Sequence, residues 1–236
     1  MSLIKMIRKL TRSLLLVTAT LIFSCALSFV STAENDVNEY YFKRNQENKI
    51  ALTFDDGPHP IYTPRILDIL DKYNIKATFF IIGVNAKNYK DTLKEIVRRG
   101  HEIGNHTFSH SMIKNQSPSS VVYEIEECRR LIYEISGENP IIFRPPGGLM
   151  AKLDPDDAEL LESYNIVLWS IDTLDWSHRS PEEISDYVTN EIKSGDIILM
   201  HDYIGFNSPT PEALELMIPQ LLKMGYHFTT VSDLIS

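Results

Sequence analysis

Residues 50–58 read Ile-Ala-Leu-Thr-Phe-Asp-Asp-Gly-Pro, an apolar run that ends in two carboxylates and a turn. The run favours a buried strand over 50–54, which Gly57-Pro58 would end. Adjacent carboxylates repel each other unless positive charge lies nearby, and consecutive strand residues point to opposite faces. Asp55 and Asp56 can therefore serve one site only where the strand breaks. Taken alone, the cluster fits an ordinary Asp-Gly turn equally well.

The alternation of short apolar runs with helical stretches continues through the rest of the chain. Strands are predicted at 50–54, 77–82, 102–104, 141–143, 166–171, 197–200 and 227–231. Amphipathic helices are predicted at 63–73, 91–99, 118–136, 155–163, 181–193 and 211–224. Several helices begin near a proline and end at a glycine, as helices commonly do. The alternation predicts a parallel sheet covered by helices.

Polar clusters follow five of the seven predicted strands, at 55–56, 105–106, 144–146, 172–176 and 201–202. In an open doubly wound sheet, ligand residues concentrate near one switch point, whereas all strands of a barrel end at one mouth. Contributions from five strands therefore favour a barrel of about seven strands. No glycine-rich phosphate-binding motif follows the first strand, so a nucleotide site is not indicated.

His106 and His110 are candidate metal ligands. Their spacing predicts two imidazoles on one face of a helical turn, able to bind one metal ion. Thr107 stands where a zinc protease has glutamate, so that chemistry is not indicated. A lone pair with this spacing is slightly more typical of surface or capping histidines. Two histidines combined with an aspartate from another strand are a known catalytic metal arrangement.

Two other clusters contain candidate catalytic groups. Arg144 precedes Pro-Pro-Gly-Gly at a strand end, where it could pair with a carboxylate or simply lie on the surface. His201 directly follows a buried strand and could act as a general acid if a carboxylate held its other nitrogen. A strand-end histidine without catalytic function is the commoner case. Trp176 fits either the core or a wall for a sugar ring.

Five motifs in this order, TFDDGP, HEIGNHTFSH, FRPP, DTLDW and LMHD, resemble the polysaccharide deacetylase family, carbohydrate esterases of family 4 with a NodB homology domain. The resemblance covers about residues 48–236. It implies an α/β fold of one domain, a distorted (β/α)7 barrel. A divalent metal is also implied, most often zinc, with cobalt, manganese, nickel or iron as alternatives.

The resemblance also implies a role for each site residue. Asp56, His106 and His110 would hold the metal, and Asp55 would be the catalytic base. Arg144 would pair with Asp55, and Asp175 would hold His201, the catalytic acid. Trp176 and Leu199 would line the pocket for the acetyl methyl group.

Gly147 departs from the family pattern, in which an aromatic residue usually follows Arg-x-Pro. In the family, the backbone N–H at this position helps to stabilise the oxyanion, and glycine retains that N–H. The missing side chain would border the groove, so we expect the departure to affect substrate preference rather than the chemistry.

The resemblance implies a hydrolase that removes N-acetyl groups from a polysaccharide, either peptidoglycan or a chitin-like polymer of N-acetylglucosamine, and releases acetate. The alternatives are an O-acetyl esterase on acetylxylan-like polymers and a noncatalytic glycan-binding wall protein. A two-carboxylate glycosidase is a weaker alternative because it would not need the histidine pair.

The N-terminal 33 residues have the parts of a secretory signal. Four basic residues precede an apolar run at 14–30, and Ser31-Thr32-Ala33 follows it. We expect cleavage after Ala33 and a secreted or cell-surface protein, with 34–47 as a tether to a domain at 48–236. An uncleaved membrane anchor is the alternative, because 17 residues are near the lower limit for spanning a bilayer. A lipoprotein through Cys25 is disfavoured by the bulky Phe23.

The net charge and the number of cysteines exclude some classes of partner and of structural site. The chain has a net charge of -9, and removal of residues 1–33 leaves 19 basic against 32 acidic side chains, a net charge of -13. Nonspecific binding to nucleic acid requires a basic surface and is not expected. Two cysteines cannot form a disulfide-rich scaffold or a cysteine-ligated zinc site. We expect a monomer that binds an N-acetylated glycan and contacts a membrane only through an uncleaved N-terminal segment.

Overall fold

The structure is a computed structural model that describes residues 39–45, 47–150, 160–161, 163–203, 205 and 207–236. The expected signal at 1–33, the first part of the expected tether and most of the predicted helix at 155–163 lie outside these residues. Within them, no helix is both long enough and apolar enough to cross a membrane.

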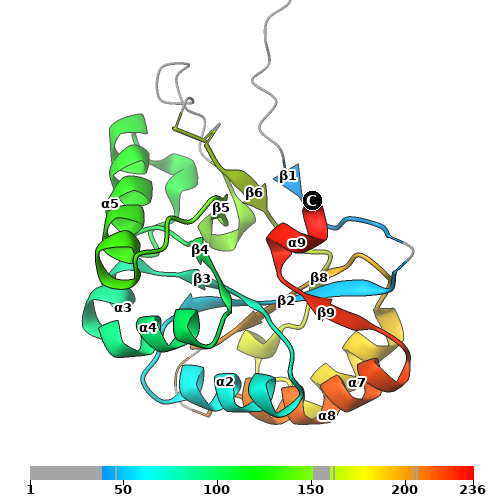
Figure 1. The fold of residues 1–236 in the computed structure, drawn as a ribbon. Helices are drawn as coiled ribbons and strands as arrows, with labels where there is room; N and C mark the ends of the chain where they lie inside the picture. Colours follow the sequence, from blue (N-terminus) through cyan, green and yellow to red (C-terminus); the bar gives the residue numbers. More distant parts are fainter. Residues whose placement is uncertain (1–38, 46, 151–159, 162, 204, 206) are drawn as a thin grey trace, which may run out of the picture. The chain divides into compact units, whose positions relative to one another are not determined.

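The strands form a parallel sheet whose order differs from their order in the sequence. They are β1 (Glu39–Tyr40), β2 (Lys49–Gly57), β3 (Thr78–Ile81), β4 (Glu102–Asn105), β5 (Ile142–Phe143), β6 (Asn165–Val167), β7 (Ile171–Asp172), β8 (Ile197–His201) and β9 (His227–Thr229). The order across the sheet is β1-β6-β5-β4-β3-β2-β8-β7, and β9 pairs with the start of β2. The sheet curls into an incomplete barrel (Figure 1), which confirms the predicted distorted (β/α)7 fold in one domain.

Helices cover the outside of the sheet (Figure 1). They are α2 (Tyr62–Lys72), α3 (Gly83–Asn88), α4 (Lys90–Arg98), α5 (Pro118–Ser136), α7 (Pro181–Glu191), α8 (Thr210–Lys223) and α9 (Val231–Ile235). Short 3-10 turns are η1 (Ile113–Asn115), η2 (Pro146–Gly148) and η3 (Asp175–Ser177). At the start of α7, Ser180 and Glu183 form a reciprocal capping box next to Pro181. Local capping chemistry thus accounts for helix starts that the sequence predicts.

Side chains of β2 alternate between two sides of the sheet. Ile50, Leu52 and Phe54 belong to the large apolar cluster shared with the outer helices, whereas Ala51 belongs to a separate cluster with residues of β8 and α9. Because side chains alternate along a strand, Thr53 and Asp55 share the inner side with Ala51. The fold therefore directs Asp55 into the barrel.

The predicted strand at 166–171 is divided in two, so the prediction of one continuous strand is wrong. β6 pairs with β5 and β1, whereas β7 pairs with β8 at the other end of the sheet. Between them, the Leu168 N–H donates to Tyr40 O at 2.7 Å, and the Ser170 N–H donates to Ile197 O at 3.0 Å. The hydrogen-bond partners therefore change midway along this run. The run crosses the gap between the β6 end and the β7 end of the curled sheet.

Part of the segment expected to be a tether is built into the sheet. β1 pairs in parallel with β6, and the Lys43 N–H donates to Gly195 O at 2.9 Å. The Arg44 guanidinium lies 2.7 Å from the carboxylate of buried Asp196. Residues 39–44 therefore contribute to the domain, because they cover a sheet edge that would otherwise present unpaired backbone groups.

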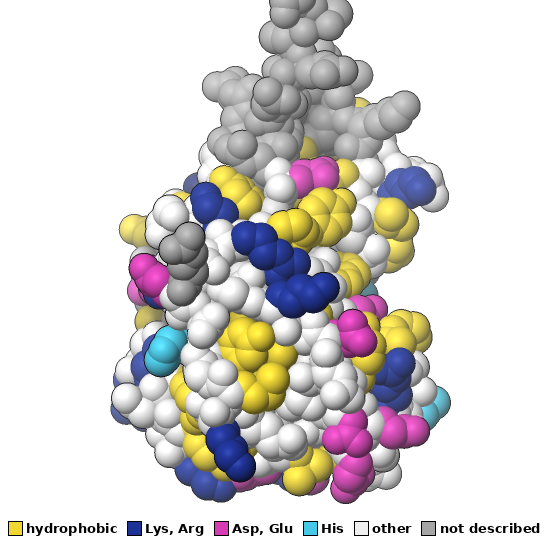
Figure 2. Space-filling model, turned by 90° about the vertical axis from the view of Figure 1, so that its right-hand side faces the viewer, with side chains coloured by type: hydrophobic (Ala, Val, Ile, Leu, Met, Phe, Trp, Pro, Cys, Tyr) yellow, Lys and Arg dark blue, Asp and Glu magenta, His cyan; other side chains and the backbone are white. Residues whose placement is uncertain are grey.

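Charges of both signs are distributed over the surface. Figure 2 shows the face on the right of Figure 1, where lysine and arginine side chains form a band among hydrophobic and neutral ones. Acidic side chains gather below this band (Figure 2). This face thus presents no continuous field of one sign.

Candidate active site

Asp55 and Asp56 lie side by side because β2 is irregular at its end. Asp55 pairs in register with His201 of β8, and the register between β2 and β3 shifts between Phe54 and Gly57. Asp56 has a left-handed backbone, with φ of 76°. A Cβ atom at Gly57 would collide with the buried carboxylate of Asp202, so this position requires glycine. The irregularity allows both carboxylates to face one site.

His106 and His110 meet Asp56 through a loop after β4, not through the helical turn that their spacing predicts. Thr107 and His110 have positive φ angles of 68° and 59°, which turn the chain back on itself. One ligand atom from each of Asp56, His106 and His110 lies within 4.8 Å of the others. A loop, and not a helical turn, thus brings the three predicted ligands together.

The three residues fit a bound cation. The His106 Nδ1–H donates to Arg144 O at 2.6 Å, so Nε2 is the ring nitrogen directed toward Asp56. Asp56 Oδ1 is buried and has no hydrogen bond of good geometry within the described residues, although the Nε2 atoms of His110 and His106 lie 3.1 and 3.5 Å away. Burial acts to raise the pKa of Asp56, but the two histidines outweigh it and hold that pKa well below its usual range. An anionic oxygen and two ring nitrogens converge as they do at divalent metal sites.

Arg144 is fully buried and has several hydrogen-bond partners. Its Nη1 donates to Asp55 Oδ1 at 2.7 Å and to Thr53 Oγ1 at 2.8 Å. Its Nε and Nη2 donate to the carbonyls of Val167 and Leu168 at 3.0 and 2.9 Å. These carbonyls lie where β6 ends, so the guanidinium occupies the gap in the barrel. Arg144 therefore orients Asp55 and satisfies backbone groups that the broken sheet leaves unpaired.

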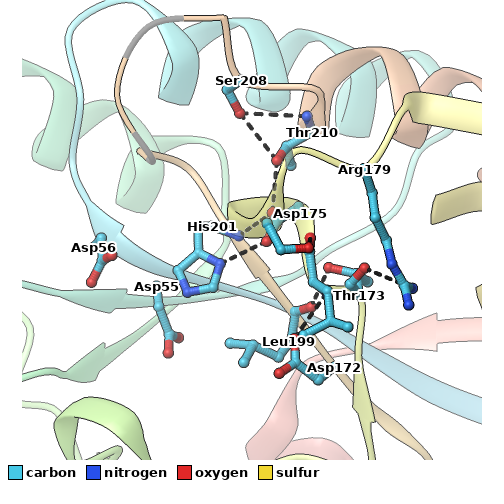
Figure 3. A network of polar contacts seen from close by, with 12 residues as sticks. Asp55, Asp56, Asp172, Thr173, Asp175, Arg179, Leu199, His201, Ser208 and Thr210 are labelled. Atoms are coloured by element: carbon cyan, nitrogen blue, oxygen red, sulfur yellow. Dashed lines mark hydrogen bonds and ion pairs between the residues drawn. The ribbon is translucent and has the colours of Figure 1, made fainter. Parts of the chain in front are cut away.

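His201 is held by Asp175 of η3 (Figure 3). The His201 Nδ1–H donates to Asp175 Oδ1 at 2.8 Å, and the His201 backbone N–H donates to Oδ2 at 2.8 Å. Burial acts to lower the pKa of His201, but the hydrogen bond and charge of Asp175 outweigh it and raise that pKa to about 9. The imidazole is therefore protonated at neutral pH, and its ring lies on the side of Asp175 that faces Asp55 (Figure 3).

The three residues expected to contact substrate have different surroundings. Leu199 is buried, and its carbonyl accepts a hydrogen bond from Thr173 Oγ1 at 2.9 Å. Trp176 is 53% exposed and lines a cavity of about 490 Å³ together with Asp175 and Tyr62. Gly147 lies in η2 with φ of 64°, a left-handed conformation that disfavours the aromatic residue usual in the family.

Several residues around the site were not predicted to have a function. Thr53 accepts from Arg144, Thr210 Oγ1 donates to Asp175 at 2.8 Å, and Asn85 Nδ2 donates to the Asp56 carbonyl at 2.7 Å. Thr53 could have been suspected as a polar residue in a buried strand. Asn85 and Thr210 carry no such signal, because their contacts join segments distant in the sequence.

The arrangement combines three chemical capabilities. Asp55 has one oxygen bound to Arg144, while its Oδ2 lies 3.7 Å from His106 Nε2 and faces the candidate metal site. His201 lies on the neighbouring strand, where it can donate a proton, and the Asp56–His106–His110 cluster can hold a cation. A candidate base, a candidate acid and a cation site within one mouth can together promote hydrolysis of an unactivated acyl group.

Comparisons with known proteins identify relatives of this chain. A family model described as polysaccharide deacetylase matches residues 42–165. The peptidoglycan-N-acetylglucosamine deacetylase of Bacillus cereus is 41% identical over 197 residues, which cover 81% of this chain and 90% of the relative. The peptidoglycan-N-acetylmuramic acid deacetylase PdaC of Bacillus subtilis is 37% identical, over 78% of this chain and 38% of PdaC.

Solved structures share the fold. The Bc1960 peptidoglycan N-acetylglucosamine deacetylase is 32% identical with a TM-score of 0.79, over 87% of this chain and 95% of that one. A family 4 acetyl xylan esterase from Clostridium thermocellum, solved with a cobalt ion, is 36% identical with a TM-score of 0.71, over 79% and 90% of the two chains.

Proposed function

The chain belongs to the polysaccharide deacetylase family, and we propose that it is a metal-dependent enzyme that removes N-acetyl groups from cell-wall peptidoglycan and releases acetate. The observation that carries this proposal is the placement of Asp55 between Arg144 and the Asp56–His106–His110 cluster. The proposed substrate is supported by two relatives, which are deacetylases of N-acetylglucosamine and of N-acetylmuramic acid in peptidoglycan. The export signal expected at residues 1–33 would bring the enzyme to that polymer.

The metal would be held by Asp56, His106 and His110, and zinc is our first choice because imidazole and carboxylate suit it. When bound, a divalent cation supplies Lewis acidity and lowers the pKa of water. The chain itself fixes the ligands. The His106 tautomer is set by its hydrogen bond to the Arg144 carbonyl, and the Asp56 backbone is held by Asn85.

Asp55 would act as the general base. Arg144 holds its Oδ1, so Oδ2 remains available to accept a proton from the attacking water. The adjacent carboxylates thus have separate roles, one as base and one as ligand.

His201 would protonate the departing sugar nitrogen. Because Nδ1 is bonded to Asp175, Nε2 carries the proton that can be transferred to the substrate. An amide requires this proton, since an amine anion is a poor leaving group. The Gly147 N–H would stabilise the charge on the carbonyl oxygen, a contribution that is usually large.

Acetate release with and without a chelator tests the proposal. We expect the purified protein to release acetate from peptidoglycan or from N-acetylglucosamine oligomers, to lose this activity after chelation and to regain it with zinc or cobalt. Separate analysis of the glucosamine and muramic acid formed identifies the sugar. Chelator-insensitive turnover would contradict the metal dependence.

Release of acetate from acetylxylan alone would favour an O-acetyl esterase, a second candidate function supported by the similarity to the Clostridium thermocellum structure.

Asn85 offers a separate test of the metal site. Replacing it with leucine removes the donor that holds the Asp56 carbonyl while keeping the side-chain size. We expect zinc affinity to fall roughly 10- to 100-fold, as is typical when a residue that orients a ligand is lost. A competition titration against a chromophoric chelator measures this. Asn88→Leu, at an exposed position of the same helix, is the matched control. Equal affinity of the two variants would exclude a role of Asn85 in orienting Asp56.

A further inference from the structure

Three aromatic rings form a stack beside the candidate metal site. The rings of Tyr203 and His59 are nearly parallel, with centroids 4.4 Å apart and an interplanar angle of 6°. On the other side, His59 stacks on Tyr62 at 5.2 Å and 27°. The three residues come from the segments that follow β8 and β2, the two strands that carry His201 and Asp55. The stack therefore lies at the mouth of the barrel.

Tyr203 shares a cavity with two of the three candidate metal ligands. This cavity, of about 350 Å³, is lined by Asp56, His110, Asn85 and Tyr203 among others. Tyr203 is 41% exposed, although it is a large aromatic residue. Tyr62 also lines the cavity of about 490 Å³ that contains Trp176. The stack thus connects two cavities at the mouth, and none of the catalytic roles described above uses it.

The stack is held in place from several sides. His59 Nδ1 accepts hydrogen bonds from the N–H groups of Ile61 and Tyr62 at 3.3 and 3.2 Å. The Tyr62 hydroxyl accepts from the N–H of Asn207 at 2.8 Å and of Ser208 at 3.3 Å, which anchors the segment after Tyr203. Burial lowers the pKa of His59, the middle ring. A pre-organised aromatic surface needs little ordering when a ligand binds.

We propose that Tyr203, supported by His59, is a platform on which a sugar ring of the glycan rests, and that it determines affinity for the polymer. The proposal rests on the proposed function, because it assumes a carbohydrate substrate. A pyranose ring presents C–H groups on one face, and these complement the electron-rich face of an aromatic ring. Binding sites for such ligands combine aromatic walls with a few fixed polar groups, as this cavity does.

The test compares three variants. We expect Tyr203→Ala to raise KM for an N-acetylglucosamine tetramer about tenfold, with kcat little changed, because the stacking contact is formed in both ground and transition states. Tyr203→Phe keeps the ring and should restore the KM of the parent. Hydrolysis of an aryl acetate that lacks a sugar, and the metal content, should be unchanged in every variant. Tyr133→Ala, at a 59% exposed aromatic residue on α5, is the matched control.

Calorimetry separates this proposal from the proposed function. Binding of the tetramer is measured in Asp55→Asn protein with and without Tyr203→Ala, so no turnover is required. If the parent enzyme is active and Tyr203→Ala changes neither KM nor Kd for the tetramer, the platform proposal is overturned and the proposed function is not. Loss of affinity in Tyr203→Phe as large as in Tyr203→Ala would also overturn it, because the hydroxyl would then be responsible. A parent protein that neither releases acetate nor binds the tetramer would overturn both proposals.

Discussion

Asp55→Asn is expected to reduce kcat by at least about 10²- to 10⁴-fold, the usual contribution of a general base, while the bound metal remains. Asparagine has the shape of aspartate, and its amide oxygen can still accept from Arg144, but it cannot take a proton from water. Asp55 is not among the three residues that we propose as metal ligands. Acetate release and metal content measured on the same preparation test both parts. Retention of more than a few per cent of the activity would show that another group is the base.

The same variant should also lose stability. Arg144 is fully buried, and Asp55 is the carboxylate that neutralises it. Removing one partner of a buried ion pair costs about 3–5 kcal/mol, and we expect the lower end because a neutral acceptor remains. Urea unfolding measures the loss. Asp68→Asn is the matched control, because Asp68 is 70% exposed in its pair with Arg99, and such pairs contribute less than about 1 kcal/mol. Equal stability losses would contradict the special importance of the buried pair.

Asp175→Asn is expected to lower kcat by about 10²- to 10⁴-fold at mildly alkaline pH and to shift the pH profile. With Asp175 present, the pKa of His201 is about 9, so the protonated acid is available below that pH and is lost as the pH rises through it. Without that carboxylate, burial still lowers the pKa of the ring, and only the smaller effects of the Asp55 and Asp56 charges remain to raise it. The alkaline limb of kcat/KM should therefore move to lower pH.

The pH profile on N-acetylglucosamine oligomers tests this prediction. Asp172→Asn is the control, because the Asp172 side chain accepts from the Leu174 N–H and makes no hydrogen bond to His201. An aryl acetate should be less sensitive to Asp175→Asn, since its leaving group departs without a proton. An alkaline limb that stays in place in Asp175→Asn would show that His201 is not the titrating acid.

The sequence was sufficient for those features that depend on local chemistry. Apolar runs and proline or glycine at helix ends predicted most of the strands and helices, because burial and capping act over a few residues. Polar clusters at strand ends predicted a shared mouth, since parallel strands all end at the same side. The identity of the candidate residues, including Asp56, His106 and His110, was available because the five motifs are contiguous stretches of sequence.

Other features depend on contacts between distant segments. The run 166–171 is apolar except for Ser170, yet its hydrogen-bond partners change from β5 and β1 to β8, a change that the periodicity of the sequence does not reveal. The filling of this gap by Arg144 and the loop that brings His110 to Asp56 were likewise decided by the fold. So was the stack of Tyr203 on His59, two residues 144 positions apart. Local sequence determines which side chains are present and which backbone they prefer, whereas long-range packing decides which of them meet.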